Sequence, residues 1–191
     1  MGGYGNNTGE YARQLSTSTF TAEEVAIFLA DFSWGFPGQI RFDISADDTL
    51  TYNISGLTAE GQQLAEWAVE TWGVALGINV QATTSIVNVS TNRLATYGTT
   101  IDSYSFETYL HEIGHALGLG HAGPHDGSAT FGTDNVYLND IVLITLMSYL
   151  RVSDNPNVEG GQALRVSPMP ADLLAIQRLY GPAEVYGGDT I

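Results

Sequence analysis

The stretch His-Glu-Ile-Gly-His-Ala-Leu-Gly-Leu-Gly-His, residues 111–121, constrains the fold of this chain more than any other segment. It contains three of the four histidines among the 191 residues. On an α-helix from about Phe106 to Gly118, His111 and His115 are four residues apart and share one face. Gly118 tolerates a positive φ, so the helix can end there and the chain can turn sharply. We therefore expect a helix that is followed by a tight turn.

The spacing of these residues predicts a metal site. Two imidazoles one helical turn apart can both reach a zinc ion at ~2.0–2.1 Å, and the turn at Gly118 can bring back His121 as a third ligand. Three neutral histidines leave the fourth tetrahedral position to water, which is the arrangement of a catalytic zinc site. Glu112 is rotated by about 100° from His111 around the helix, so it flanks the metal and can accept a proton from the bound water.

The alternative is a chance occurrence, because a bare His-Glu-x-x-His pattern is found in many proteins. Gly118 and His121 at their required offsets favour the metal site instead. Packing gives no reason for three histidines beside apolar residues such as Ile113 and Leu117. The chain has no cysteine, which excludes disulfides, thiol nucleophiles and cysteine-type zinc clusters.

Composition limits the class of protein. Hydrophobic residues make up 43% of the chain and aromatic residues 10%, which favours one globular domain. Asp and Glu number 21 against six arginines and no lysine, for a net charge of −15. Such a charge argues against binding to nucleic acid or to anionic membrane surfaces. The longest apolar run, residues 141–147, is far shorter than the ~20 residues of a membrane span.

Periodicity and capping signals predict helices and strands along the rest of the chain. Thr21-Ala-Glu-Glu24 has the form of a capping box and opens a helix to about Asp31. The other predicted helices run from Thr58 to about Leu76 and from about Ala171 to Tyr180. The predicted strands are 39–45, 78–83, 85–90 and, as a short edge strand, 93–99. Some fifty largely irregular residues follow Gly118, and an irregular region of that length is usually functional.

The pattern His-Glu-x-x-His-x-x-Gly-x-x-His resembles the signature of the metzincin metalloproteases. Their Met-turn, a methionine beneath the zinc, is matched by Met147 in Thr-Leu-Met-Ser-Tyr-Leu, residues 145–150. The order Met-Ser-Tyr resembles the serralysins, in which the tyrosine ligates or approaches the zinc; here it is Tyr149. Residues 168–181 are similar to the last catalytic-domain helix of serralysins. The chain therefore resembles a serralysin-like metzincin.

The resemblance implies an α+β fold with two lobes. One lobe would hold a twisted, mixed five-stranded sheet with two long helices and the active-site helix, and the irregular lower lobe would hold the Met-turn and the C-terminal helix. We expect a flexible N-terminal arm at 1–19, a protease domain at 20–182 and a tail at 183–191. The sequence departs from the serralysins at Ala122, where they have proline, and it lacks their calcium-binding repeats. Calcium is therefore expected only in a C-terminal repeat domain.

The resemblance also implies a secreted, monomeric zinc endopeptidase with one catalytic zinc ion. Glu112 would act as the general base, Tyr149 would stabilise the oxyanion, and an extended peptide or protein substrate would pair with the edge strand at 93–99. Residues 1–14 lack the features of a Sec-type signal peptide, so export would follow a type I route with a C-terminal signal. The alternatives are a matrixin-type metzincin protease and a non-catalytic zinc-binding or adhesive module. Glu112 argues against the module, because a structural site has no use for a base.

Two further features are interpreted without a catalytic role. His125 is expected to be a surface loop histidine rather than a contact of a ligand or of a second metal. An acidic and amide-rich cluster follows it and invites a calcium site, but its spacing matches no EF-hand loop. We therefore expect a solvated acidic loop, formed by Asp126, Asp134, Asn135, Asn139 and Asp140.

Overall fold

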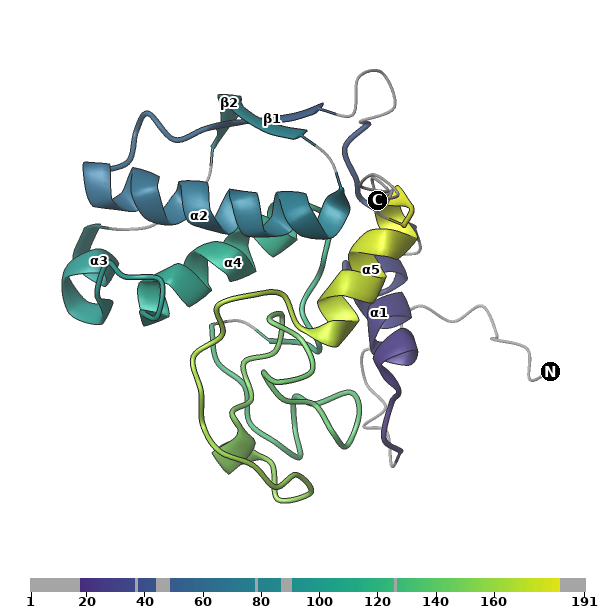
Figure 1. The fold of residues 1–191 in the computed structure, drawn as a ribbon. Coiled ribbons are helices and arrows are strands. Elements are labelled where there is room, and N and C mark those ends of the chain that lie inside the picture. Colours follow the sequence, from purple (N-terminus) through teal and green to yellow (C-terminus); the bar gives the residue numbers. More distant parts are fainter. Residues whose placement is uncertain are drawn as a thin grey trace, which may run out of the picture.

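The computed structural model describes residues 18–36, 38–43, 49–77, 79–86, 91–125 and 127–182. Figure 1 shows helices above an irregular region, with a short sheet at the top. The elements, in chain order, are α1 (Ala22–Asp31), β1 (Thr49–Asn53), α2 (Ala59–Leu76), β2 (Asn79–Ile86), α3 (Thr91–Tyr97), α4 (Tyr104–Ala116), the 3-10 helix η1 (Val152–Asp154) and α5 (Pro170–Tyr180). The predicted arm and tail lie outside the described residues, except for Ser18 and Thr19.

Side-chain caps begin the helices where the sequence predicts them. The Thr21 hydroxyl accepts from the Glu24 amide at 3.2 Å, and the Glu24 carboxylate accepts from the Thr21 amide at 2.8 Å. Thr58 caps α2 by accepting from the Gly61 amide. These bonds satisfy amide groups that a helix leaves without an intrahelical partner. The three predicted helices outside the histidine stretch are therefore confirmed.

The sheet is smaller than expected. Among the described residues it has two strands, β1 and β2, which run parallel with Thr49 opposite Asn79. Helix α2 connects them, as a parallel pair requires a crossover. The predicted strands 78–83 and 85–90 form one strand, β2, as far as their residues are described. The described part of the predicted strand 39–45, residues 39–43, has no strand pairing. The five-stranded mixed sheet is therefore not seen.

The predicted edge strand at 93–99 is wrong, because Thr91–Tyr97 form helix α3. Tyrosine and threonine gave this stretch a β-like composition, but tertiary contacts decide its conformation. Leu94 is buried, and the Arg93 guanidinium lies 5.7 Å from the ring centres of both Tyr97 and Tyr104. Arg93 and Tyr97 are four residues apart, so a helix brings their side chains together, which a strand cannot do.

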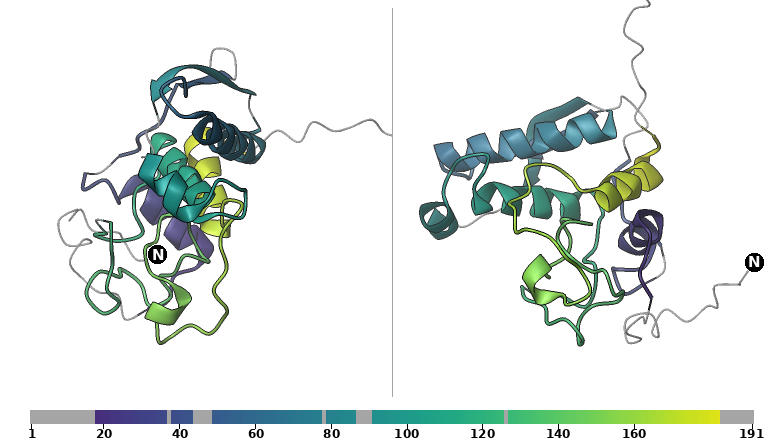
Figure 2. Two further views of the ribbon diagram at one scale, coloured as in Figure 1. Left: turned by 90° about the vertical axis from the view of Figure 1, so that its left-hand side faces the viewer. Right: turned by 60° about the horizontal axis from the view of Figure 1, so that its bottom comes forward.

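Two pairs of helices form the frame of the molecule. Helix α2 lies along α4, and α5 lies against α1, as Figures 1 and 2 both show. Trp72 of α2 is buried and donates from its indole nitrogen to the Leu110 carbonyl of α4 at 3.0 Å. This hydrogen bond ties the longest helix to the helix that carries the histidine motif. The motif therefore sits on a rigid, buried support.

Residues 117–169 are largely irregular, with η1 as the exception in the described part. They form the region below the helices in Figure 1. This region is nevertheless packed, since Tyr137, Met147 and Leu150 are fully buried. The expectation of a long irregular segment after the motif is confirmed.

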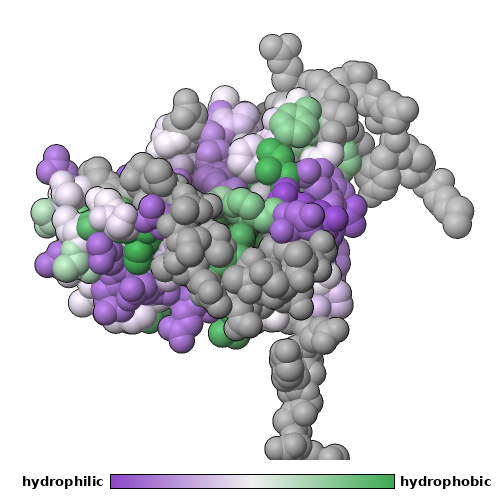
Figure 3. Space-filling view, turned by 90° about the horizontal axis from the view of Figure 1, so that it is seen from above, coloured by the Kyte–Doolittle hydropathy of each residue, from purple (hydrophilic) through white to green (hydrophobic). Residues whose placement is uncertain are grey.

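The surface seen from the side of the sheet mixes hydrophilic and hydrophobic residues. Figure 3 shows separate hydrophobic patches there rather than one continuous area. Among the described helices, none has the length and apolar character needed to cross a membrane.

Candidate metal centre

Helix α4 and the turn after it position the histidines. Ser103 caps α4 by accepting from the Phe106 amide at 3.1 Å. The helix ends before Gly118, whose φ of 103° lies in the region that favours glycine. A Cβ at this position would lie 1.9 Å from the Ile40 carbonyl oxygen, so no other residue fits. The indole of Trp34 donates to the Gly118 carbonyl at 2.9 Å and fixes the turn.

The turn brings the three histidines of the motif together. One ring nitrogen from each of His111, His115 and His121 lies within 4.8 Å of the others. The Nε2 atoms of His115 and His121 are 2.9 Å apart. In the described part of the chain this is the single group of three or more residues with metal-ligand spacing.

Backbone carbonyls orient two of these rings. His111 Nδ1 donates to the Leu146 carbonyl at 2.7 Å, and His115 Nδ1 donates to the Leu119 carbonyl at 2.8 Å. A carbonyl oxygen can only accept, so the proton is on Nδ1 and Nε2 presents its lone pair. Histidine ligands of metals are normally held in this way. The donor set therefore fits a metal ion of the zinc type, with three imidazole ligands.

The environment keeps His111 neutral. Burial, together with the nearby His115 and His121, lowers the pKa of His111 to about 3, although the Leu146 carbonyl favours the charged form. A metal binds the neutral imidazole, so a low pKa removes competition from protons at neutral pH. The Trp34 ring packs against the neighbouring His115, with the ring centres 5.9 Å apart.

Met147, the expected Met-turn residue, packs against the helix that carries the first two histidines. Its side chain is fully buried, and its Sδ lies 3.0 Å from the place where a Cβ of Gly114 would be. Gly114 stands between the two histidines of α4, so the absence of a side chain there admits the thioether. The Met147 carbonyl also accepts from the Ala122 amide at 3.0 Å, which joins the Met-turn to the segment after the third histidine.

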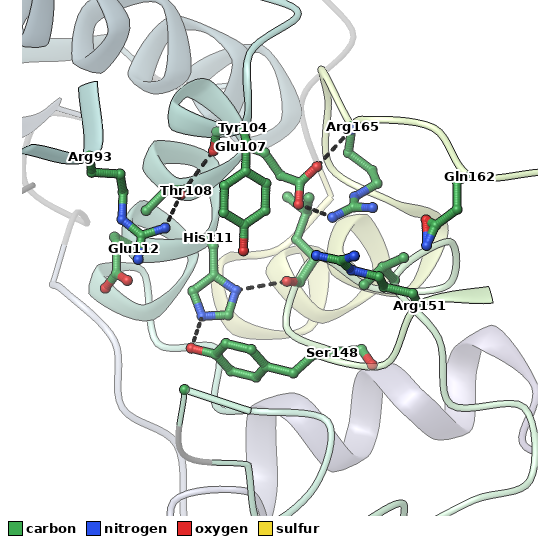
Figure 4. A pocket seen from close by; sticks show the side chains of 14 residues that line it. Arg93, Tyr104, Glu107, Thr108, His111, Glu112, Ser148, Arg151, Gln162 and Arg165 are labelled. Carbon is green, nitrogen blue, oxygen red and sulfur yellow. Dashed lines mark hydrogen bonds and ion pairs between the residues drawn. The ribbon is translucent and has the colours of Figure 1, made fainter. Parts of the chain in front are cut away.

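Tyr149 and Glu112 line the same pocket as His111, and Figure 4 shows Glu112 beside His111. The Tyr149 hydroxyl is 3.5 Å from His111 Nε2, and its ring centre is 5.1 Å from that of His121. The Glu112 carboxylate has no hydrogen-bond or ion-pair partner among the described residues. It is therefore available to a water molecule or a substrate.

His125 is not a surface residue, so that expectation is wrong. It is buried, and its Nε2 lies 3.5 Å from Oδ2 of Asp140, whose side chain is also fully buried. Its Nδ1 accepts from the Tyr149 amide at 3.4 Å. Ser148 donates to Asp140 at 2.6 Å, which completes a buried polar network behind Tyr149. The carboxylate lies fifteen residues further along the chain, so local sequence gave no signal of the pairing.

The acidic cluster is only partly a solvated loop. Asp140 and Asn135 are buried, which corrects the expectation for these two residues. Asn135 accepts from the Gly132 amide, and Asn139 exchanges two hydrogen bonds with the Phe20 backbone. Asp134 accepts from the Thr130 amide. These side chains satisfy backbone groups of the irregular region, and Asp126 lies outside the described residues.

Sequence reasoning missed Asp172 at the start of α5. The carboxyl is fully buried and accepts from the Thr145 hydroxyl at 2.5 Å, the Leu146 amide at 2.8 Å and the Met169 amide at 2.8 Å. Burial raises the pKa of Asp172 to about 6, against these hydrogen bonds and the charge of Arg165. An acidic residue in the first turn of a helix is common, so only its burial distinguishes it.

Comparison with known proteins supports the resemblance seen in the sequence. The chain is 31% identical to metalloprotease AprA of Pseudomonas entomophila over 193 residues, covering 95% of the chain. It is 39% identical to serralysin C of Dickeya chrysanthemi over 83 residues, covering 42% of the chain, and 22% identical to a serralysin of a Photorhabdus species over 201 residues, covering 79%. The resemblance to serralysin-like metalloproteases is therefore confirmed.

The matches extend over only part of each relative. The chain spans 38% of the length of metalloprotease AprA, 17% of serralysin C and 41% of the Photorhabdus serralysin. No family model matches the chain.

Proposed function

We propose that this chain is a zinc-dependent endopeptidase with the bilobal fold of a serralysin-like metzincin. The convergence of His111, His115 and His121 carries the proposal, because two of the three rings are oriented so that Nε2 presents a lone pair. Its similarity to proteins named metalloprotease and serralysin supports the same activity. Three histidine ligands with an adjacent glutamate most often bind zinc in hydrolytic enzymes.

The chemistry follows from the groups around the histidines. A zinc ion held there would act as a Lewis acid and would lower the pKa of a water molecule bound to it. Glu112, whose carboxylate has no partner in the described structure, would take a proton from the attacking water and pass it to the leaving amine. The Tyr149 hydroxyl would donate a hydrogen bond to the oxyanion that develops on the substrate carbonyl. The buried network around His125 would hold the Tyr149 backbone in place.

The substrates we propose are peptides or proteins in an extended conformation. They would lie across the pocket beside Glu112 rather than on an edge strand at 93–99, where helix α3 stands. We further propose that the protein is secreted as a monomer through a type I route. Calcium would be required only by a C-terminal repeat domain. Residues 20–182 would form the protease domain between an arm and a tail.

The test separates metal binding from turnover. Zinc-loaded protein should cleave casein and lose the activity in a chelator. Glu112→Ala should keep about one zinc per molecule and lose about 10²-fold or more in kcat. Glu70→Ala, at an exposed position of α2, removes the same charge far from the histidines and should cleave like the unmodified protein. A native chain that binds zinc but never hydrolyses peptides would favour the non-catalytic module.

A further inference from the structure

A pocket opens directly beside the proposed catalytic groups, and its lining is unlike the rest of the molecule. Helix α4 supplies His111 and Glu112, and the segment after the Met-turn supplies Tyr149 (Figure 4). A substrate residue that flanks the scissile bond would therefore place its side chain in this pocket. What enters the pocket is decided by the charges that surround it.

Arginines concentrate in this pocket. Arg93, Arg151 and Arg165 line it, which is half of the six arginines in a chain without lysine and with a net charge of −15. Figure 4 shows Arg151 and Arg165 on one side of Tyr104 and His111, and Arg93 on the other. The acidic residues of the lining are Glu107 and Glu112. Three arginines against two glutamates give this lining a small positive formal charge on a strongly acidic protein.

The three arginines are held differently. Arg165 forms a buried ion pair with Glu107, and its amide also donates to that carboxylate at 3.1 Å, so its charge is compensated within the wall. Arg93 donates to the Thr108 hydroxyl at 3.2 Å and lies beside two tyrosine rings. Arg151 is exposed, and no described carboxylate forms an ion pair with its guanidinium. Arg151 is therefore the cation best able to bind an incoming anion.

We propose that this pocket selects a substrate carboxylate, with Arg151 as its principal ligand and Arg93 as a second cation nearby. The inference rests on the proposed peptidase function and names the substrate class: peptides with aspartate or glutamate beside the scissile bond, or with a free terminal carboxylate there. A guanidinium matches a carboxylate with two parallel hydrogen bonds. At physiological salt the screening length is about 8 Å, so the local arginines outweigh the net negative charge of the protein.

The experiment uses two peptides that differ only by glutamate or glutamine beside the scissile bond, each with a free and an amidated C-terminus. Binding is measured by calorimetry to the zinc-loaded Glu112→Gln protein, which does not turn over, and cleavage is measured with the native protein. The glutamate peptide should bind roughly tenfold more tightly than the glutamine peptide. If both free peptides bind alike and amidation weakens both by roughly tenfold, the terminal carboxylate is the anion.

Arginine variants, made in the same Glu112→Gln protein, assign the preference. Arg151→Gln should reduce it to within about twofold, and Arg151→Glu should favour a lysine peptide over the glutamate peptide. Arg178→Gln is the matched control, since Arg178 pairs with Asp31 on the exterior of α5, and it should keep the preference. Equal binding of all four peptides to the parent protein, or a full preference for the carboxylate in Arg151→Gln, would overturn the inference. Selective binding without any cleavage by the native protein would uphold the carboxylate site and refute the peptidase proposal.

Discussion

Asp172 offers a quantitative test of how the Met-turn is held. Its carboxyl joins the start of α5 to Thr145 and Leu146, and the Leu146 carbonyl in turn accepts from His111 Nδ1. The substitution Asp172→Asn keeps an oxygen that can accept from the two amides and adds an NH₂ that can donate to the Thr145 oxygen. It removes the charge, keeps the acceptor for the two amides and reverses the hydrogen bond with Thr145. Asp172→Ala removes the contacts as well.

The pH dependence follows from the raised pKa of Asp172. Its value rises from 3.8 to about 6 on folding, so between these values the folded state binds more protons than the unfolded state. Stability contributed by this group is complete at low pH and falls as pH rises through that window, by about 3 kcal/mol in all. About 1 kcal/mol of this is lost between pH 5 and 7. Asp172→Asn lacks this loss and should gain stability relative to the native protein over that interval.

The alanine variant should behave in the opposite way. It leaves the Leu146 and Met169 amides and the Thr145 hydroxyl buried without an acceptor, at about 1 kcal/mol or more each. A loss of at least about 3 kcal/mol is expected, which is large against a typical total of roughly 5–15 kcal/mol. Because the Leu146 carbonyl also orients the His111 ring, zinc affinity should fall by about tenfold or more.

Urea unfolding of the metal-free proteins in chelator at pH 5, 6 and 7 measures these effects. The difference in unfolding free energy between the native protein and Asp172→Asn isolates the carboxyl, because all other groups titrate alike in both. Asp102→Asn is the control: hydrogen bonding to Thr100 lowers the pKa of this exposed carboxyl, which stays charged throughout the range. A native-minus-Asp172→Asn difference that stays constant from pH 5 to 7 would refute the reasoning.

Two other predictions concern Tyr149 and His125, which accepts a hydrogen bond from the Tyr149 amide. Tyr149→Phe should keep its zinc and a KM within a few-fold of the native value. Its kcat should fall by about 10²–10³, because one donor to the oxyanion is lost. An unchanged kcat in steady-state assays would leave Tyr149 with a packing role only. His125→Phe should remove the acceptor of the Tyr149 amide and the ion-pair partner of Asp140, which keeps its hydrogen bond from Ser148. It should lower the unfolding free energy in urea by about 1 kcal/mol or more. No loss of stability would show that the His125 contacts contribute nothing.

Local features were predictable because the groups that specify them are close in the sequence. The capping box of Thr21 and Glu24 spans three residues, and the histidine motif lies on one helix and its turn. Glycine at position 118 could be predicted to adopt a positive φ without knowledge of the rest of the fold. In each case the deciding hydrogen bond, face or dihedral angle belongs to a single segment.

The errors concern features that distant segments decide. Residues 91–97 have β-like composition, yet the burial of Leu94 and the stacking of Arg93 against tyrosines favour a helix. His125 is buried because Asp140, from a later turn of the irregular region, lies beside it. Charged and polar residues in a stretch rich in glycine and asparagine normally predict solvent exposure. The apolar run 141–147 indicates that this region has an interior, but no local pattern indicates that His125 and Asp140 lie in it.

Asp172 connects the last helix, α5, to the histidines through the backbone of Leu146. A single residue, Leu146, accepts a hydrogen bond from His111 through its carbonyl and donates one to Asp172 through its amide. Any movement of α5 that breaks the second bond also releases the group that fixes the His111 tautomer. Metal binding and the docking of α5 must then favour each other, and by thermodynamic linkage the coupling is equal in both directions. A residue 61 positions beyond the first histidine thus helps to set metal affinity, although it is not a ligand.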